Sequence, residues 1–306
     1  MKKTCIFDGV VADLPIPFEE DGAVDWFGFG RILASCRSGG CAGFLVGGNE
    51  AETLSQKERM GLLEDAAIAA GGKGQVILSL QASKGQKNIE EAVLASECGA
   101  TSLLLRWDLP LPPTGYFRLL RSIKKECPLP VLVHCKNTTT AGCLGLMETP
   151  ACGVLEDCTS LSEKLLLSDL LEESNAPLPM IAENEECLAL LPTVGYAGLL
   201  SRSVCCCPHG ITTMWKTKNL HPTPKFQRCL RTLCRFFAGN EGVPSLKWAL
   251  HRKGVCSPTV RLPFCEPEDS VKAAIERALE DVEGIGNRGQ GIGIRQGETF
   301  REKFSP

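Results

Sequence analysis

Short apolar runs, each bounded by glycine, proline or charged residues, recur along the whole chain. Eight of them have the length and composition of β-strands. They span residues 6–12, 43–47, 75–80, 102–106, 130–135, 154–156, 179–182 and 198–201. Segments with apolar residues at helical spacing lie between them, at 26–38, 56–70, 89–98, 116–126, 144–148, 160–173 and 185–193. This alternation is typical of βαβ units around a parallel sheet.

Eight strands with intervening helices predict a (β/α)8 TIM barrel over residues 1–208. Further helices at 212–216, 225–238, 245–252 and 270–283 predict a C-terminal helical extension over 209–283, packed on the barrel. Residues 284–306 are rich in glycine and charge and predict a mobile tail. The GIGNRG run there has no strand before it and no helix after it, so we reject a dinucleotide-binding interpretation.

The composition and charge of the chain argue against several classes of protein. The chain has 306 residues, 43% of them hydrophobic and 23% charged, which is enough to bury a large core. With 33 basic and 36 acidic residues there is no positive field to attract nucleic acid. No apolar run approaches the roughly 18 residues that span a membrane, and the start MKKTCIFDG lacks the apolar stretch of a secretory signal. We expect a soluble, cytoplasmic protein.

The 17 cysteines raise the question of metal or disulfides. Their spacing does not bring two closely spaced pairs together, as a tetrahedral site requires. Adjacent residues such as Cys205, Cys206 and Cys207 cannot all point at one ion. We therefore expect mostly free thiols that pack as small hydrophobic side chains, and we predict no metal and no cofactor.

Several motifs occur together and in order. The N-terminal PIPFEEDGAVDW is followed by LVGGNEAETLSQKER after the second strand, then by PLPVLVH, GVLED, GYAGLLS, PSLKWAL and VRLP. With these motifs the chain resembles the dihydrodipicolinate synthase and N-acetylneuraminate lyase family over roughly residues 5–283. The resemblance implies a TIM barrel that forms homo-oligomers, either tetramers or dimers, and a carbon-carbon lyase or aldol reaction on pyruvate or another 2-oxo acid.

In that family a barrel lysine forms an imine with the ketone, and the imine then accepts electrons from the bond being broken. The resemblance places Leu155 of GVLED where relatives carry this lysine. Leucine has no nucleophile. Standard synthase or neuraminate lyase activity is therefore expected to be lost or altered.

Other family positions also differ. The resemblance aligns His134 with a proton-shuttling tyrosine and Asp108 with a second tyrosine. Gly47, Gly48 and Asn49 stand where relatives bind the substrate carboxylate through hydroxyl groups, so that glycine amides would have to bind the anion. Leu155 and Leu200 are expected to line the substrate pocket.

Two hypotheses follow. In the first, a divergent lyase uses His134 as acid and base, and Lys136, two residues further along the strand, is a candidate replacement for the imine lysine. In the second, a catalytically silent barrel binds a small carboxylate or serves as an oligomeric partner. A solvated loop lysine is the alternative interpretation of Lys136. We interpret Glu50 and Glu156 as structural residues that hold loops or cap helices.

Overall fold

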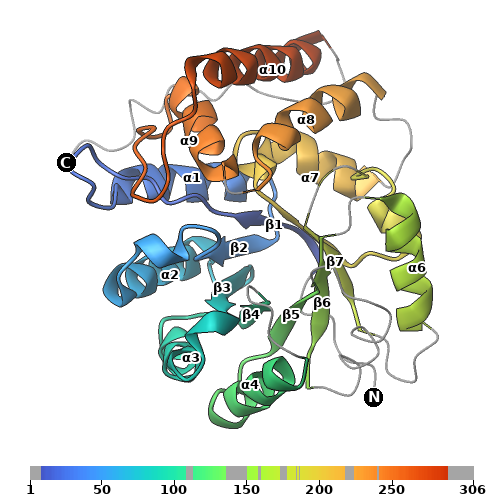
Figure 1. The fold of residues 1–306 in the computed structure, drawn as a ribbon. Coiled ribbons are helices and arrows are strands. Elements are labelled where there is room, and N and C mark those ends of the chain that lie inside the picture. The colour runs from blue at the N-terminus through green and yellow to red at the C-terminus, as the bar shows by residue number, and fades with distance from the viewer. Residues whose placement is uncertain are drawn as a thin grey trace.

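The computed structural model describes residues 8–107, 113–135, 150–157, 160–172, 178–183, 185, 187–217, 224–239 and 241–288. Its parallel strands hydrogen-bond in sequence order from β1 to β8, and β8 pairs with β1 to close the barrel (Figure 1). The strands are β1 (Gly9–Asp13), β2 (Gly43–Val46), β3 (Gln75–Gln81), β4 (Ser102–Arg106), β5 (Val131–Cys135), β6 (Gly153–Glu156), β7 (Met180–Ala182) and β8 (Gly198–Ser201). The predicted TIM barrel with additional C-terminal helices is confirmed.

Helices cover the outside of the barrel. Those between strands are α1 (Trp26–Ser38), α2 (Gln56–Ala70), α3 (Lys87–Glu97), α4 (Pro113–Glu126) and α6 (Leu161–Glu172). Those after β8 are α7 (Pro208–Thr217), α8 (Pro224–Phe236), α9 (Gly242–Arg252) and α10 (Asp269–Arg288). Helix α10 packs on both α8 and α9, and these three helices gather on one side of the barrel (Figure 1).

Most predicted elements occur close to their expected positions, and one helix was predicted wrongly. The helix expected over 185–193 is replaced by turns and the short 3-10 helix η3 (Leu191–Val194). Pro192 explains the difference, since proline lacks the N–H that an α-helix needs at that position. Helix α10 runs to Arg288, five residues beyond its predicted end. The helix expected over 144–148 lies outside the described residues.

The barrel interior contains a ring of aliphatic side chains, one from each strand. The ring consists of Val11, Leu45, Ile77, Leu104, Leu132, Leu155, Ile181 and Leu200, each at most 2% exposed. A second, larger apolar cluster fills the space between the sheet and the helices. Since side chains alternate between the two faces of a strand, the next inward-facing positions lie two residues further along each strand.

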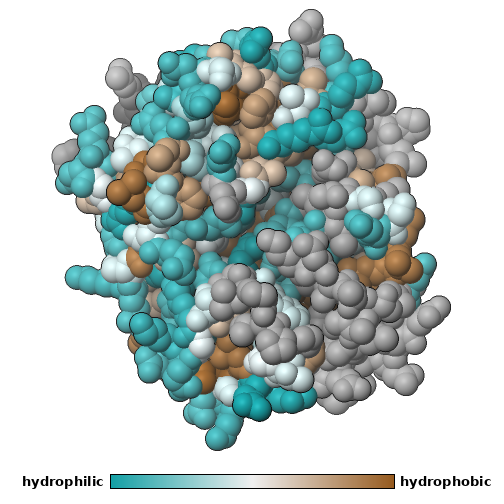
Figure 2. Space-filling view, in the orientation of Figure 1, coloured by the Kyte–Doolittle hydropathy of each residue, from teal (hydrophilic) through white to brown (hydrophobic). Residues whose placement is uncertain are grey.

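The surface differs from this interior. On the face shown in Figure 2, hydrophilic side chains predominate and hydrophobic ones form small separate patches. Among the described residues, no helix is long and apolar enough to span a membrane.

Candidate functional site

A cavity of about 360 Å³ opens above the aliphatic ring, at the carboxyl ends of the strands. Six charged or titratable residues that line it lie two positions beyond ring residues. This charged ring consists of Asp13, Arg106, His134, Asp157, Glu183 and Arg202. The strand period places these side chains on the inner face of the barrel, one level above the aliphatic floor. In TIM barrels the chemistry occurs at this end.

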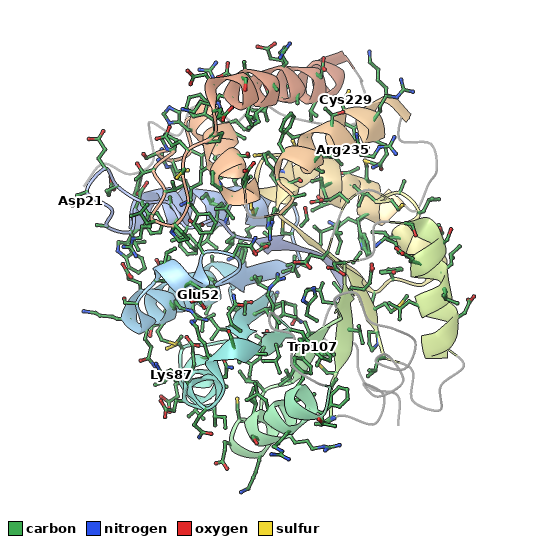
Figure 3. The ribbon with its side chains drawn as sticks, viewed as in Figure 1. Asp21, Glu52, Lys87, Trp107, Cys229 and Arg235 are labelled. Carbon is green, nitrogen blue, oxygen red and sulfur yellow. The ribbon has the colours of Figure 1, made fainter. Side chains whose placement is uncertain are left out.

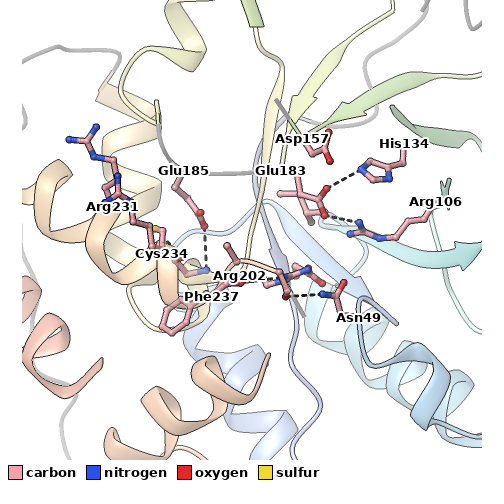
Figure 4. A pocket seen from close by; sticks show the side chains of 16 residues that line it. Asn49, Arg106, His134, Asp157, Glu183, Glu185, Arg202, Arg231, Cys234 and Phe237 are labelled. Atoms are coloured by element: carbon pink, nitrogen blue, oxygen red, sulfur yellow. Dashed lines mark hydrogen bonds and ion pairs between the residues drawn. The ribbon is translucent and has the colours of Figure 1, made fainter. Parts of the chain in front are cut away.

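Glu183 connects two of its neighbours in the charged ring. Its Oε1 lies 2.6 Å from Nη1 of Arg106, which donates a hydrogen bond, and its Oε2 lies 3.1 Å from Nε2 of His134 (Figure 4). Burial alone would raise the pKa of Glu183, but the charges of Arg106 and Arg202 and the contact with His134 hold that pKa well below its usual range. Glu183 is therefore ionised at neutral pH.

The guanidinium of Arg106 is stabilised by the same contacts. Burial disfavours its charge, yet nearby carboxylates, chiefly Glu183 and Asp13, raise its pKa above the ordinary value. Trp107, labelled in Figure 3, follows Arg106 in the chain. It stacks on Tyr116 of α4 with ring centroids 4.6 Å apart. The end of β4 is thus held against α4, and Arg106 projects into the cavity.

Arg202 and Asp13 form a second ion pair within the charged ring. Nε of Arg202 donates to Oδ2 of Asp13 at 2.9 Å, and its Nη1 donates to the carbonyl of Phe237 at 3.1 Å. Nδ2 of Asn49 donates to the carbonyl of Gly239 at 3.4 Å. These contacts hold the segment that follows α8 over one side of the cavity (Figure 4).

Glu185 lines the cavity on the side nearest α8. Its carboxylate accepts hydrogen bonds from the hydroxyl of Ser201 and from the backbone N–H of Ser203. Arg231 and Arg235 of α8 also line this side and are exposed. Figure 3 places Arg235 on α8, and Figure 4 shows Arg231 and Glu185 away from the cluster of Arg106, His134 and Glu183.

Three buried donor or acceptor atoms of this site have no hydrogen-bond partner among the described residues: Nη2 of Arg106 and both ring nitrogens of His134, of which Nε2 lies beside the Glu183 carboxylate. Both side chains line the cavity, and both residues are less than 10% exposed. A buried polar atom left without a partner costs about 1–3 kcal/mol. An anionic or hydrogen-bonding ligand in the cavity would satisfy them.

Some of the site residues predicted from the sequence line the cavity, and others lie elsewhere. His134, Asn49 and Leu200 line the cavity. Leu155 packs in the aliphatic ring inside the barrel and is not among the described residues that line the cavity. Gly47, with φ +76°, and Gly48 turn the chain after β2.

The Gly47–Gly48 turn does not line the cavity in the described part of the chain, and Gly48 packs directly against the carboxylate of Asp13. Asp108 and Lys136 lie outside the described residues.

Glu50 and Glu156 form buried ion pairs away from the cavity. Oε1 of Glu50 lies 2.5 Å from Nζ of Lys247, and its Oε2 accepts the N–H of Ile16 at 2.8 Å, so it holds a loop. Glu50 makes no side-chain helix cap. Oε1 of Glu156 lies 2.5 Å from Nζ of Lys164, with both side chains fully buried. Lys247 and Lys164 thus each neutralise a buried carboxylate.

Two further expectations from the sequence concern disulfides and metal ions. Thirteen cysteines with described side chains form no disulfide. Among the described residues, no three histidine, cysteine or acidic side chains come together in a way that would hold a metal ion.

The family motifs did not single out Arg106, Glu183 or Arg202. A sequence signal was nevertheless present, because each is a charged residue at the end of an apolar run, two positions after an inward-facing aliphatic residue. The pairing of Arg106 with Glu183 joins residues 77 positions apart and had no local signal.

Comparisons with known proteins agree with the fold and the motifs. Residues 6–105 match the model of the Dihydrodipicolinate synthetase family. A 4-hydroxy-tetrahydrodipicolinate synthase of Gluconobacter oxydans is 24% identical over 303 residues, covering 92% of this chain and 99% of that protein. The corresponding synthase of Cytophaga hutchinsonii is 26% identical over 288 residues, covering 89% and 95%.

Solved structures show the same fold. A monomeric dihydrodipicolinate synthase variant superposes with a TM-score of 0.82 at 18% identity, covering 92% of this chain and 99% of that one. A prophage protein of the dihydrodipicolinic acid synthase family from E. coli K12, solved in complex with pyruvate, superposes with a TM-score of 0.81 at 16% identity, covering 91% and 99%.

Proposed function

We propose that this chain is a divergent member of the dihydrodipicolinate synthetase family, that its cavity binds a small 2-oxo acid and that the protein acts on this acid as a lyase. Two structural relatives were solved in complex with pyruvate, which makes pyruvate the first ligand to test. The observation that carries the proposal is the pair of buried, unsatisfied atoms in the described part of the cavity, Nη2 of Arg106 and Nδ1 of His134. A carboxylate or a carbonyl oxygen is the complement of a guanidinium N–H.

We propose further that the chemistry proceeds without an imine at position 155. Leu155 belongs to the aliphatic ring beneath the cavity, and the described residues that line the cavity include no lysine. The remaining groups suit proton transfer. His134 takes a proton from the carbon next to the ligand carbonyl, the electron pair of that C–H bond forms the new C=C bond, and the π pair of the carbonyl moves onto its oxygen. The guanidinium of Arg106 stabilises the resulting enolate.

The test uses pyruvate in deuterated water, because loss of its methyl proton signal reports proton removal without any second substrate. We expect pyruvate to bind, measured by calorimetry, and to exchange its methyl protons. Arg106→Met should weaken binding at least tenfold. Arg118→Met, which removes an exposed arginine of α4 outside the cavity, should leave affinity unchanged. His134→Gln should bind pyruvate and lose the exchange.

The outcomes separate the hypotheses. Failure of pyruvate to bind, or equal affinity of wild type and Arg106→Met, would overturn the proposal. Binding without exchange would favour the catalytically silent barrel. Borohydride added with pyruvate should leave the protein mass unchanged, whereas a trapped adduct would show that a lysine forms an imine after all.

A further inference from the structure

We infer that Glu183 is a positioning residue, which holds the proton of neutral His134 on Nε2 and thereby makes Nδ1 the basic nitrogen of the ring. The inference rests on the role proposed for His134 and names the atom that acts. Neither the family motifs nor the comparisons assign a role to Glu183.

The geometry gives each carboxylate oxygen of Glu183 a separate neighbour. Arg106 lies 2.6 Å from Oε1, and Nε2 of His134 lies 3.1 Å from Oε2. The imidazole N–H is not aimed straight at Oε2, so the contact is mainly electrostatic. It still selects the tautomer, because an ionised carboxylate only accepts protons and a lone pair on Nε2 would be repelled at this distance.

The surroundings keep Glu183 in the ionised form. Arg106 and Arg202 both line the cavity and lower the pKa of Glu183 against the effect of burial. Asp13 and Asp157 also face the cavity and add negative charge, and Asp13 is paired with Arg202. Glu183 therefore keeps its negative charge beside Nε2 of His134 at neutral pH.

The remaining ring nitrogen is then free to act as a base. Nδ1 of His134 is buried and has no hydrogen-bond partner among the described residues, while the side chain lines the cavity. The arrangement follows the logic of a Ser-His-Asp triad, in which the carboxylate orients the imidazole. There, changing the carboxylate to an amide lowers the rate about 10⁴-fold because the wrong tautomer forms.

Glu183→Gln is the informative variant. Arg106 offers only N–H groups, so the new amide oxygen must turn toward Arg106, and the amide NH₂ must then face Nε2 of His134. Nε2 becomes an acceptor and the proton moves to Nδ1. The nearly isosteric change thus removes the base while keeping the shape of the site.

The experiment is nitrogen-15 NMR of the imidazole rings in ligand-free protein at pH 8. The chain has four histidines, and the His134 signals are assigned by their loss in His134→Gln. We expect wild type to carry the proton on Nε2 and Glu183→Gln to carry it on Nδ1. Glu185→Gln is the matched control, since Glu185 lines the same cavity and is bonded to serines instead, and it should keep the wild-type pattern.

A proton on Nδ1 in the wild type, or an unchanged pattern in Glu183→Gln, would overturn the inference, and the wild-type spectrum alone decides if the variant does not fold. With pyruvate in deuterated water, Glu183→Gln should slow methyl exchange at least 100-fold and change affinity less than fivefold. The tautomer switch supports the inference even if wild type exchanges no pyruvate protons, a result that would count against the proposed proton transfer only.

Discussion

The buried ion pair between Lys164 and Glu156 provides a direct test of how contacts between the barrel strands and the surrounding helices stabilise the fold. Lys164 on α6 and Glu156 at the end of β6 meet at 2.5 Å, and neither side chain is exposed to solvent. Nζ of Lys164 also lies 5.5 Å from the centre of the Tyr196 ring. Lys164→Met keeps the length and apolar stem of the side chain and removes only its charge.

The expected cost follows from burial. Removing Lys164 takes its positive charge away from the buried Glu156 carboxylate, and breaking a buried pair in this way typically costs about 3–5 kcal/mol. Lys253 and Glu283 form a control pair with the same 2.5 Å separation, but their side chains are 30% and 48% exposed. Solvent screens such a pair, so Lys253→Met should cost less than about 1 kcal/mol.

The assay is urea unfolding followed by circular dichroism, with the free energy of unfolding taken from the midpoint and slope. The double variant Lys164→Met with Glu156→Gln removes both charges and should recover more than half of the loss. Equal losses in Lys164→Met and Lys253→Met would refute the argument from burial. A loss below about 1 kcal/mol in Lys164→Met would do the same.

Four further outcomes are expected. Hydrogen bonds from Arg261 lower the pKa of Glu58 to about 2, so Glu58 stabilises the fold above its usual pKa and this contribution is lost as pH falls toward 2. Glu58→Gln should therefore cost about 1–2 kcal/mol at pH 7 and progressively less below pH 4.5 in urea titrations, allowing for solvent screening. Lys136→Ala should fold and bind pyruvate like wild type in calorimetry. Titration of denatured, unreduced protein should recover most of the 17 cysteines as thiols. Sedimentation should show a homo-oligomer, as the family resemblance implies.

The fold was predictable because each strand and helix of a barrel produces a recognisable pattern within a short segment of the sequence. Each strand is a short apolar run ended by a charged, polar or glycine residue, as in Ser102–Arg106 of β4, and that signal needs no knowledge of distant contacts. The failure at 185–193 has a local cause as well. Leu188, Leu190 and Leu191 fit a helical pattern, but Pro192 disfavours an α-helix there.

The site was only partly predictable. Family motifs directed attention to His134, which does line the cavity. The neighbours that define its chemistry come from other strands: Arg106 lies 28 positions before it in the numbering and Glu183 lies 49 positions after it. Closure of the barrel brings the three together, and no local pattern contains that information.

The relation between the aliphatic ring and the charged ring explains how the fold could persist through the change of chemistry that we propose. If Leu155 takes the place of the imine lysine, as the family resemblance implies, the change completes an aliphatic ring to which every strand contributes. Replacing a buried amine by leucine in such a ring removes a desolvation cost and leaves the barrel intact. Reactive groups then remain only one level higher, where Arg106, His134 and Glu183 meet. The described residues of such a site can stabilise negative charge on a bound acid through a guanidinium and move protons through an imidazole, and those are the two properties that the proposed experiments measure.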